Sequence, residues 1–266
     1  MGTLLDAHVH LHDGFSVPSF LNSAAKNFNL AADRLSTRLS TSKPIVRVLA
    51  ICALGDECPL ARFREESHGW SVTSPDEHSL VLTSNESNGT LVLVAGRQVV
   101  TSEKLEVLSL FSSQPISQRK TLLETVKEVV AAEGVPVLPW GFGKWAFGRG
   151  QKLRSFLRSL DSDTPCNVLL GDNGCRWERW RSEVFAEAER SGIRVIAGSD
   201  PLPVASHVRR AGSFGSVLKN ELDFENPVKW LRDELRQTDA SPPTFGSCRS
   251  LLSLVSDQIC VRLKKS

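Results

Sequence analysis

Residues 4–14 read LLDAHVHLHDG, a short apolar run that ends in polar side chains. Such a run predicts a β-strand, on which successive side chains point to opposite faces. We therefore expect His8, His10 and His12 to lie on one face. Neutral imidazole nitrogens are good ligands for zinc, iron or nickel, so His8 and His10 are candidates to hold one metal ion. The alternative is an edge strand whose histidines face the solvent.

Strand-like and helical patterns alternate along the rest of the chain. Apolar residues recur at helical spacing over residues 17–39, and residues 45–53 form the nearly continuous apolar run of a strand buried on both faces. The same reading predicts strands at residues 135–140, 167–172 and 193–200, and helices at residues 117–132, 151–160 and 177–191. Alternating strands and helices indicate an α/β fold with a parallel sheet and right-handed crossovers.

Length and the breaks in this alternation define the expected architecture. A chain of 266 residues is close to the size of one α/β barrel, which has about 250 residues. We expect a single domain over residues 1–266, a distorted (β/α) TIM-like barrel of about seven parallel strands. Turn signals at Asn88-Gly89 and Gly96-Arg97 predict a β-meander inserted at about residues 80–104, after which residues 105–111 return to the main sheet. Two further helices are expected at about residues 226–263.

Composition narrows the expected partners. The chain has 32 Lys and Arg and 30 Asp and Glu, a net charge of +2, which predicts no binding to nucleic acid or to an anionic membrane surface. No apolar run approaches the length of about 18 residues that spans a bilayer, and the N-terminus lacks a signal-peptide pattern. These features predict a cytoplasmic protein with a small-molecule substrate, and they leave its oligomeric state open.

Two successive strands end in an aspartate, at Asp172 and at Asp200. The ends of parallel barrel strands converge at one mouth, so both carboxylates are expected to approach His8 and His10. Each Asp alone is also a common helix N-cap. For Asp200 we favour a role in the site, because Pro201 follows it and begins a rigid turn.

A further carboxylate and a glycine-rich loop complete the candidates. Glu106 lies among apolar residues of a predicted strand, where it must be paired, bind something, or face water at the strand end. Residues 141–150 form a glycine-rich loop with Lys144 and Arg149, which suits an anion at the start of the next helix. A plain loop with solvated charges is the alternative. Arg176 lies just beyond the strand that ends in Asp172.

Together these residues resemble the amidohydrolase and PHP superfamilies of metal-dependent hydrolases, in particular a bacterial branch of that group. The matching pieces are Asp6-Ala7-His8-Val9-His10 on the first strand, Gly198-Ser199-Asp200 on the last, and Glu106, which looks like the metal-bridging position of PHP enzymes. The resemblance spans roughly residues 4–215.

The resemblance implies a divalent metal ion, zinc, manganese or magnesium, that activates water. Five residues would hold it: His8, His10, Glu106, Asp172 and Asp200. Asp200 would also act in catalysis by accepting the proton of that water, and Glu106 would bridge a second ion. Four residues would hold the anionic part of the substrate: Lys144, Arg149, Asn173 and Arg176.

Departures from the family pattern keep other readings open. The middle strands end in Trp140 and Asp172 where amidohydrolases carry histidine, and Pro201-Leu202 replaces the x-His that usually follows the last Asp of PHP enzymes. An oxygen-rich ligand set suits manganese or magnesium better than a closed zinc site would. The sequence predicts hydrolysis of a phosphoester or C–N bond in a small anionic molecule. The alternatives are a metal-free barrel that binds an anionic ligand, and a lyase or isomerase on the same scaffold.

Overall fold

The computed structural model describes residues 2–39, 45–55, 57–86, 89–140, 147–160, 167–175, 183–237 and 240–248. Its strands are β1 (Thr3–Val9), β2 (Val46–Leu54), β3 (Trp70–Thr73), β4 (Ser79–Ser84), β5 (Thr90–Val100), β6 (Glu106–Leu110), β7 (Val135–Pro139), β8 (Leu169–Asp172), β9 (Val195–Ala197), β10 (Phe214–Leu218) and β11 (Thr244–Gly246). Its helices are α1 (Val17–Leu39), α2 (Ala61–Glu66), α3 (Leu122–Ala131), α4 (Phe147–Ser159), α5 (Glu183–Arg190), α6 (Pro227–Gln237) and the 3-10 helix η1 (Ala205–Arg209).

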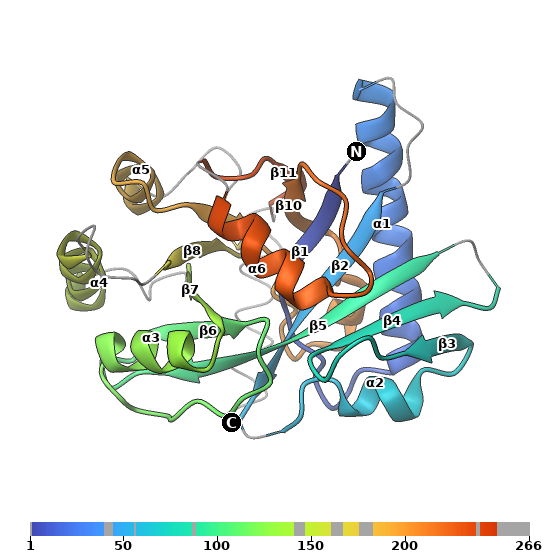
Figure 1. Ribbon diagram of the computed structural model, residues 1–266, viewed down its shortest axis with the longest axis horizontal. Coiled ribbons are helices and arrows are strands. Elements are labelled where there is room, and N and C mark those ends of the chain that lie inside the picture. Colours follow the sequence, from blue (N-terminus) through green and yellow to red (C-terminus); the bar gives the residue numbers. More distant parts are fainter. Residues whose placement is uncertain are drawn as a thin grey trace.

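The fold is α/β, with a mixed sheet that curls into a nearly closed barrel (Figure 1). The strand order is β11-β10-β1-β2-β5-β6-β7-β8-β9, and β3 and β4 form a hairpin beside β5. Strands β1, β2 and β5 pair in parallel, as do β7, β8 and β9, whereas β6 and β10 are antiparallel to their neighbours. The expectation of a purely parallel barrel of about seven strands was therefore wrong in this detail.

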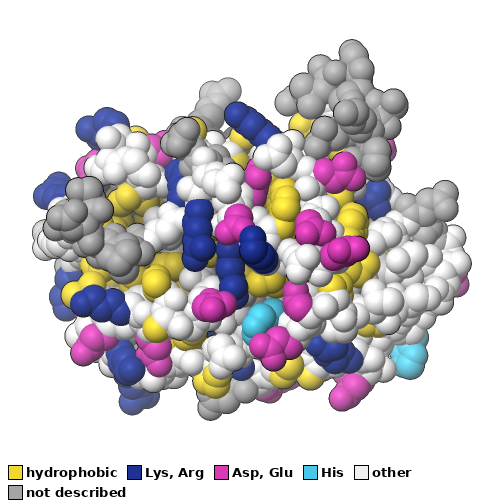
Figure 2. All heavy atoms as spheres, in the orientation of Figure 1, with side chains coloured by type: hydrophobic (Ala, Val, Ile, Leu, Met, Phe, Trp, Pro, Cys, Tyr) yellow, Lys and Arg dark blue, Asp and Glu magenta, His cyan; other side chains and the backbone are white. Residues whose placement is uncertain are grey.

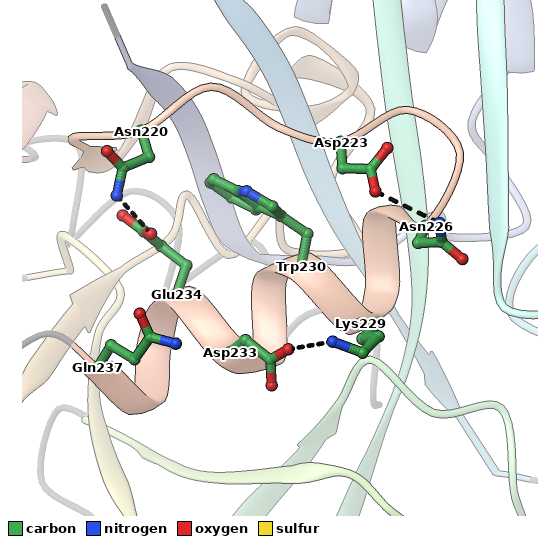
Figure 3. Close-up of a pocket in the computed structure, with 8 residues that line it drawn as sticks. All are labelled: Asn220, Asp223, Asn226, Lys229, Trp230, Asp233, Glu234 and Gln237. Carbon is green, nitrogen blue, oxygen red and sulfur yellow. Dashed lines mark hydrogen bonds and ion pairs between the residues drawn. The ribbon is translucent and has the colours of Figure 1, made fainter.

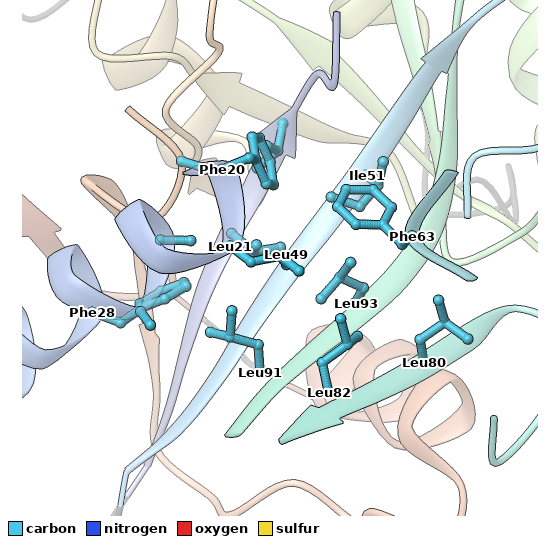
Figure 4. Close-up of a cluster of buried hydrophobic side chains, with 14 of the residues drawn as sticks. Phe20, Leu21, Phe28, Leu49, Ile51, Phe63, Leu80, Leu82, Leu91 and Leu93 are labelled. Atoms are coloured by element: carbon cyan, nitrogen blue, oxygen red, sulfur yellow. The ribbon is translucent and has the colours of Figure 1, made fainter. Parts of the chain in front are cut away.

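Three apolar layers hold the sheet and helices together. The first packs α1 and α2 on β1, β2, β4 and β5, and Figure 4 shows its large side chains, among them Phe20, Phe28 and Phe63. The second is formed by residues of the barrel strands and of α6, and in it Val48, Val94 and Leu110 cluster with Leu231 of α6. The third packs α3, α4 and α5 on β6 to β8. Since each fully buried Leu or Phe side chain stabilises the fold by about 1.5–3 kcal/mol, these layers fix the directions of the strands.

The barrel closes where β9 meets β1, and no strand ladder joins the two. The backbone N–H of Asp200 donates a hydrogen bond of 2.8 Å to the carbonyl of His8. A Cβ atom on Gly198 would lie 2.3 Å from the backbone nitrogen of His8, so only glycine allows this approach. We call this contact the closing seam. It places the ends of β1 and β9 side by side.

The predicted β-meander was misplaced. Gly96 and Arg97 lie inside the continuous strand β5, which pairs in parallel with β2 and belongs to the barrel. Gly96 is close-packed rather than a turn, since a Cβ there would lie 3.1 Å from the carbonyl oxygen of Ser109. The predicted turn at Asn88 and the predicted helix after residue 248 lie outside the described residues.

Two other boundaries differ from the sequence reading. Helix α4 already begins at Phe147, so Arg149 is helical and not part of a loop. Helix α3 begins only at Leu122, because Thr121 caps it and exchanges hydrogen bonds with Glu124 in a capping box.

The surface mixes charges. In Figure 2, Lys and Arg side chains gather near the middle of the face, over α6, with Asp and Glu side chains beside them. The net charge of +2 therefore averages over local groups of opposite sign. Among the helices that the structure describes, none is both long enough and apolar enough to cross a membrane.

Candidate metal centre

Strand β1 delivers two histidines to the end of the barrel. The register between β1 and β2 shifts between Asp6 and Val9, and such an irregularity re-aims the side chains that follow it. His8 and His10 are both buried, and their Nε2 atoms lie 2.9 Å apart. The ring of His12 lies beside that of His10, but its Nε2 donates to the carbonyl of Pro201. The strand therefore gives the centre two of the three histidines expected on one face.

Backbone geometry fixes the protonation of His10. Its Nδ1 donates a hydrogen bond of 2.6 Å to the carbonyl of Cys52, which leaves the lone pair on Nε2. Burial, together with the neighbouring ring of His8, lowers the pKa of His10 to about 4, so the imidazole is neutral at pH 7. A neutral ring whose other nitrogen is held by a hydrogen bond is the usual state of a metal-binding histidine.

Asp200 completes the cluster from the other side of the closing seam. Its Oδ1 lies 3.8 Å from Nε2 of His8 and 3.7 Å from Nε2 of His10. Its Oδ2 accepts a hydrogen bond of 2.9 Å from the side-chain amide of Asn173. Asp200 has a φ of 42°, a conformation uncommon for a residue other than glycine, which the hydrogen bond from its N–H to His8 helps to hold.

Asp6 holds the segment that carries Asp200. Its carboxylate accepts hydrogen bonds from the N–H of Ser199 (2.7 Å), the hydroxyl of Ser199 (2.6 Å) and the N–H of Gly212 (2.8 Å). Burial raises the pKa of Asp6 to about 6, although these bonds oppose the rise. Asp6 is therefore an anchor between β1 and the segment after β9.

The sequence reading missed Gln98. This half-buried side chain of β5 places its Oε1 3.0 Å from Nε2 of His8. Its position at the end of a long apolar strand was the available signal, but the turn assigned to Gly96-Arg97 concealed that strand.

The other predicted site residues lie elsewhere or carry different contacts. Asp172 is buried, and its Oδ1 accepts a hydrogen bond from the N–H of Gly174. Glu106 begins β6 opposite Val100. Asn173, which is predicted to bind substrate, donates a hydrogen bond from its side-chain amide to Oδ2 of Asp200. Arg149 lies in the first turn of α4.

The structure describes only some of the remaining candidates. Lys144 and Arg176 fall outside the described residues. His78 is not in the cluster, and its two ring nitrogens lie against the hydroxyl of Ser113 and the carboxylate of Glu77.

The donor set suits a divalent cation. Across the described ranges, His8, His10 and Asp200 form the one group of three or more potential metal ligands, with their ligand atoms within 4.8 Å of one another. Two imidazoles and a carboxylate are ligands that zinc and manganese accept. In addition, Nδ1 of His8 is buried without a hydrogen-bond partner. The residues present therefore fit a metal ion.

Two hollows help to locate the open side of the centre. One of about 190 Å³ lies against it and is lined by His10, His12, Asp13, Glu57 and Arg62, among others. A larger one of about 490 Å³ lies over α6, where Trp230 stands among polar side chains (Figure 3). None of the candidate ligands lines the larger hollow. The chemistry of the cluster therefore assigns the smaller hollow to the site.

Comparison with known proteins gives structural likeness alone. No protein-family model matches the chain, and no curated protein matches it. PsfC from Pseudomonas syringae PB-5123 is similar in structure, with a TM-score of 0.55, 14% identity and 98% of both chains covered. The lesion-specific endonuclease PfuEndoQ from Pyrococcus furiosus is similar over 88% of this chain, with a TM-score of 0.51 and 11% identity.

A further similar structure is endonuclease Q in complex with a 27-mer duplex substrate that has an abasic lesion at the active site. It has a TM-score of 0.52 and 12% identity over 89% of this chain. The chain spans 55% and 57% of the two endonuclease chains, so the likeness covers about half of each.

One expectation from the sequence is overturned by this likeness. The net charge of +2 was taken to exclude nucleic acid, yet an endonuclease with this fold is seen with duplex DNA at its active site. The exclusion was wrong, because the charge of a whole chain averages over the local fields that meet a ligand. At these identities the comparisons show that the chain shares its fold with two endonuclease structures and PsfC, and they show no superfamily.

Proposed function

We propose that this chain is a metal-dependent phosphoester hydrolase of the amidohydrolase- and PHP-like type. The observation that carries the proposal is the convergence of His8, His10 and Asp200 at the closing seam of the barrel. The metal would be manganese, zinc or magnesium. When bound, a divalent ion lowers the pKa of a water molecule to about 7 and so supplies hydroxide at neutral pH.

The chain's own residues would divide the work. His10 presents a neutral nitrogen, since its other nitrogen is tied to the carbonyl of Cys52. Asp200 presents Oδ1 toward both histidines and is the group placed to accept the proton of the attacking water. Asn173 restrains Oδ2 of Asp200, so the carboxylate cannot rotate away. Asp6 holds the backbone on which Asp200 stands.

Two considerations favour a phosphoester over a C–N bond. Endonuclease Q, which shares the fold, acts on DNA, whose backbone is a chain of phosphodiesters. The phosphate of the substrate would be held by Lys144, Arg149 and Arg176, as the sequence reading proposes, because guanidinium groups bind phosphate oxygens in pairs. Nucleic acid and smaller phosphodiesters both remain within the proposed substrate class.

Metal content and hydrolysis test the proposal together. Purified protein is stripped with chelator, reloaded with manganese or zinc, desalted, and assayed for metal by mass spectrometry and for cleavage of bis-p-nitrophenyl phosphate. We expect about one ion per chain or more in the wild type, and loss of both metal and cleavage in His10→Ala and Asp200→Ala. His68→Ala is the matched control, because His68 is exposed.

The outcomes separate the proposal from its rivals. A wild type that takes up no metal would overturn it and favour a metal-free barrel that binds an anionic ligand. Metal uptake with cleavage of amide but not phosphoester substrates would assign the C–N bond instead. Metal uptake without hydrolysis of either class would favour the lyase or isomerase reading.

A further inference from the structure

Gln98 stands at the candidate metal centre with no assigned role. Strand β5 pairs in parallel with β2, with Gln98 beside Leu54 at the end of the ladder. Its neighbours Arg97 and Val99 are buried, and Gln98 alternates with them to the face that meets His8. Because Gln98 is half-buried, its amide is both held by the strand and open to a ligand.

The distance between Gln98 and His8 is close to that between two ligands of one ion. Nitrogen and oxygen ligands bind zinc at about 2.0–2.2 Å, so two ligands of one ion lie about 3–3.5 Å apart. The Nε2 of His8 lies 2.9 Å from Nε2 of His10 and 3.0 Å from Oε1 of Gln98. The amide oxygen of Gln98 therefore stands as close to His8 as the second histidine does.

The cluster contains few negatively charged ligands. Imidazole and amide groups bind a metal ion as neutral ligands, and Asp200 is the one carboxylate in the group of ligands that the structure brings together. Sites that hold two ions place them about 3.5–4 Å apart and need anionic groups to offset their mutual repulsion. Glu106, the residue expected to bridge a second ion, is not in that group.

We propose that Gln98 is a neutral fourth ligand, so that the centre holds a single divalent ion and keeps a net charge of +1 toward an anionic substrate oxygen. This inference rests on the proposed metal site. It replaces the two-ion reading with a site of two imidazoles, one amide oxygen and one carboxylate. Glutamate has nearly the same shape as glutamine but carries a negative charge. The substitution Gln98→Glu therefore tests directly how many ions the centre holds.

The test is a manganese titration by calorimetry and electron paramagnetic resonance on the chelator-stripped protein. We expect the wild type to bind one Mn²⁺ with the spectrum of an isolated ion. Gln98→Leu should bind one ion at least tenfold more weakly. Gln98→Glu should bind two, with the spectrum of a coupled pair. Gln237→Glu is the control, since this exposed residue at the end of α6 receives the same charge change and should behave as wild type.

A second probe tests the charge of the centre. Inorganic phosphate should bind the manganese-loaded wild type at least tenfold more tightly than Gln98→Glu. The inference fails if Gln98→Leu binds manganese as tightly as the wild type, if the wild type itself holds a coupled pair, or if Gln98→Glu still holds one ion. A wild type that binds no manganese would instead overturn the proposed function, so the two failures are distinguishable. Thermal melts in chelator show whether each variant is folded.

Discussion

At the scale of single residues, burial of the Asp6 carboxylate near the site has an electrostatic cost. Its side chain is fully buried and has no cation beside it among the contacts that raise or lower its pKa. Three donated hydrogen bonds offset part of the cost of burying the charge, and the pKa of about 6 shows that they do not offset all of it. The buried carboxylate of Asp6 therefore lowers the stability of the fold at neutral pH while it holds Ser199, and with it Asp200, in place.

Asp6→Asn should lower the free energy of unfolding at pH 7 by about 1–3 kcal/mol, because an amide cannot accept all three donors and leaves one unpaired. The difference in stability between the two proteins should also depend on pH. The pKa is raised from 3.8 to about 6 on folding, so the folded state takes up a proton that the unfolded state lacks between those values. Wild-type stability relative to Asp6→Asn should rise by about 1 kcal/mol from pH 7 to pH 5.

Urea denaturation of both proteins in chelator at several pH values measures this difference. A gap between the two that stays constant from pH 7 to pH 5 would show that Asp6 does not titrate in that range.

Asn173 should control how well Asp200 serves as a ligand. Removing its amide in Asn173→Ala frees Oδ2 of Asp200, and loss of such an outer hydrogen bond costs metal affinity about 10–100-fold. Calorimetric titration with manganese measures the loss, and Asn220→Ala is the control because its amide bonds Glu234 on the exposed surface. Equal affinities in the wild type and Asn173→Ala would mean that the backbone alone orients Asp200.

At the scale of elements, the strands explain which parts of the sequence reading succeeded. Helix α1 has the predicted bounds, because a 3.6-residue apolar period shows directly which side of a helix is buried. Strand β10 is less evident in the sequence, because Gly215 interrupts its apolar residues. That glycine is required because a Cβ there would lie 2.3 Å from the carbonyl oxygen of Leu5. The cause lies on another strand, so no local pattern shows it.

Local sequence patterns also show only part of the candidate site. The ends of parallel strands do converge, which correctly predicted that Asp200 would approach His8 and His10. The convergence of strand ends predicts where the backbone of each residue lies, but it does not predict the direction of the side chain. Asp172 ends its strand as predicted, yet its carboxylate accepts a hydrogen bond from the N–H of Gly174 two residues later.

The closing seam should be the element most sensitive to a single added methyl group. Gly198→Ala places a Cβ against the backbone of His8 and must push β9 away from β1, which we expect to cost about 1–3 kcal/mol of stability and most of the metal affinity. Gly14→Ala is the control, because nothing lies within 4 Å of its added Cβ. Thermal melts and manganese titration measure both effects. Tight manganese binding by Gly198→Ala would show that the seam need not be closed for the site to form.

At the scale of the whole molecule, the candidate ligands join distant parts of the chain. His8 and Asp200 lie on two strands that meet without a ladder, and the contact between them closes the sheet. A cation bound there would hold both sides of the seam. Metal binding and the stability of the entire barrel should therefore be linked, as for any ligand that binds only the folded state.

Manganese at about 100 times its dissociation constant should stabilise the wild type by about 2.7 kcal/mol, which corresponds to a rise in Tm of about 5–10 °C. His10→Ala should melt at the same temperature with and without manganese. Scanning fluorimetry over a range of manganese concentrations measures the shift. An equal shift in His10→Ala would mean that the ion binds elsewhere on the protein.

The partners that orient the cluster are largely main-chain atoms. His10 is fixed by the carbonyl of Cys52, and Asp200 by the carbonyl of His8. A main-chain oxygen stays in place when the side chain of its residue is exchanged, provided that the strand persists. Residues around the centre are thus free to drift during evolution while its geometry is inherited, and a fold of this kind can keep its chemistry after its sequence has lost every recognisable trace of common descent.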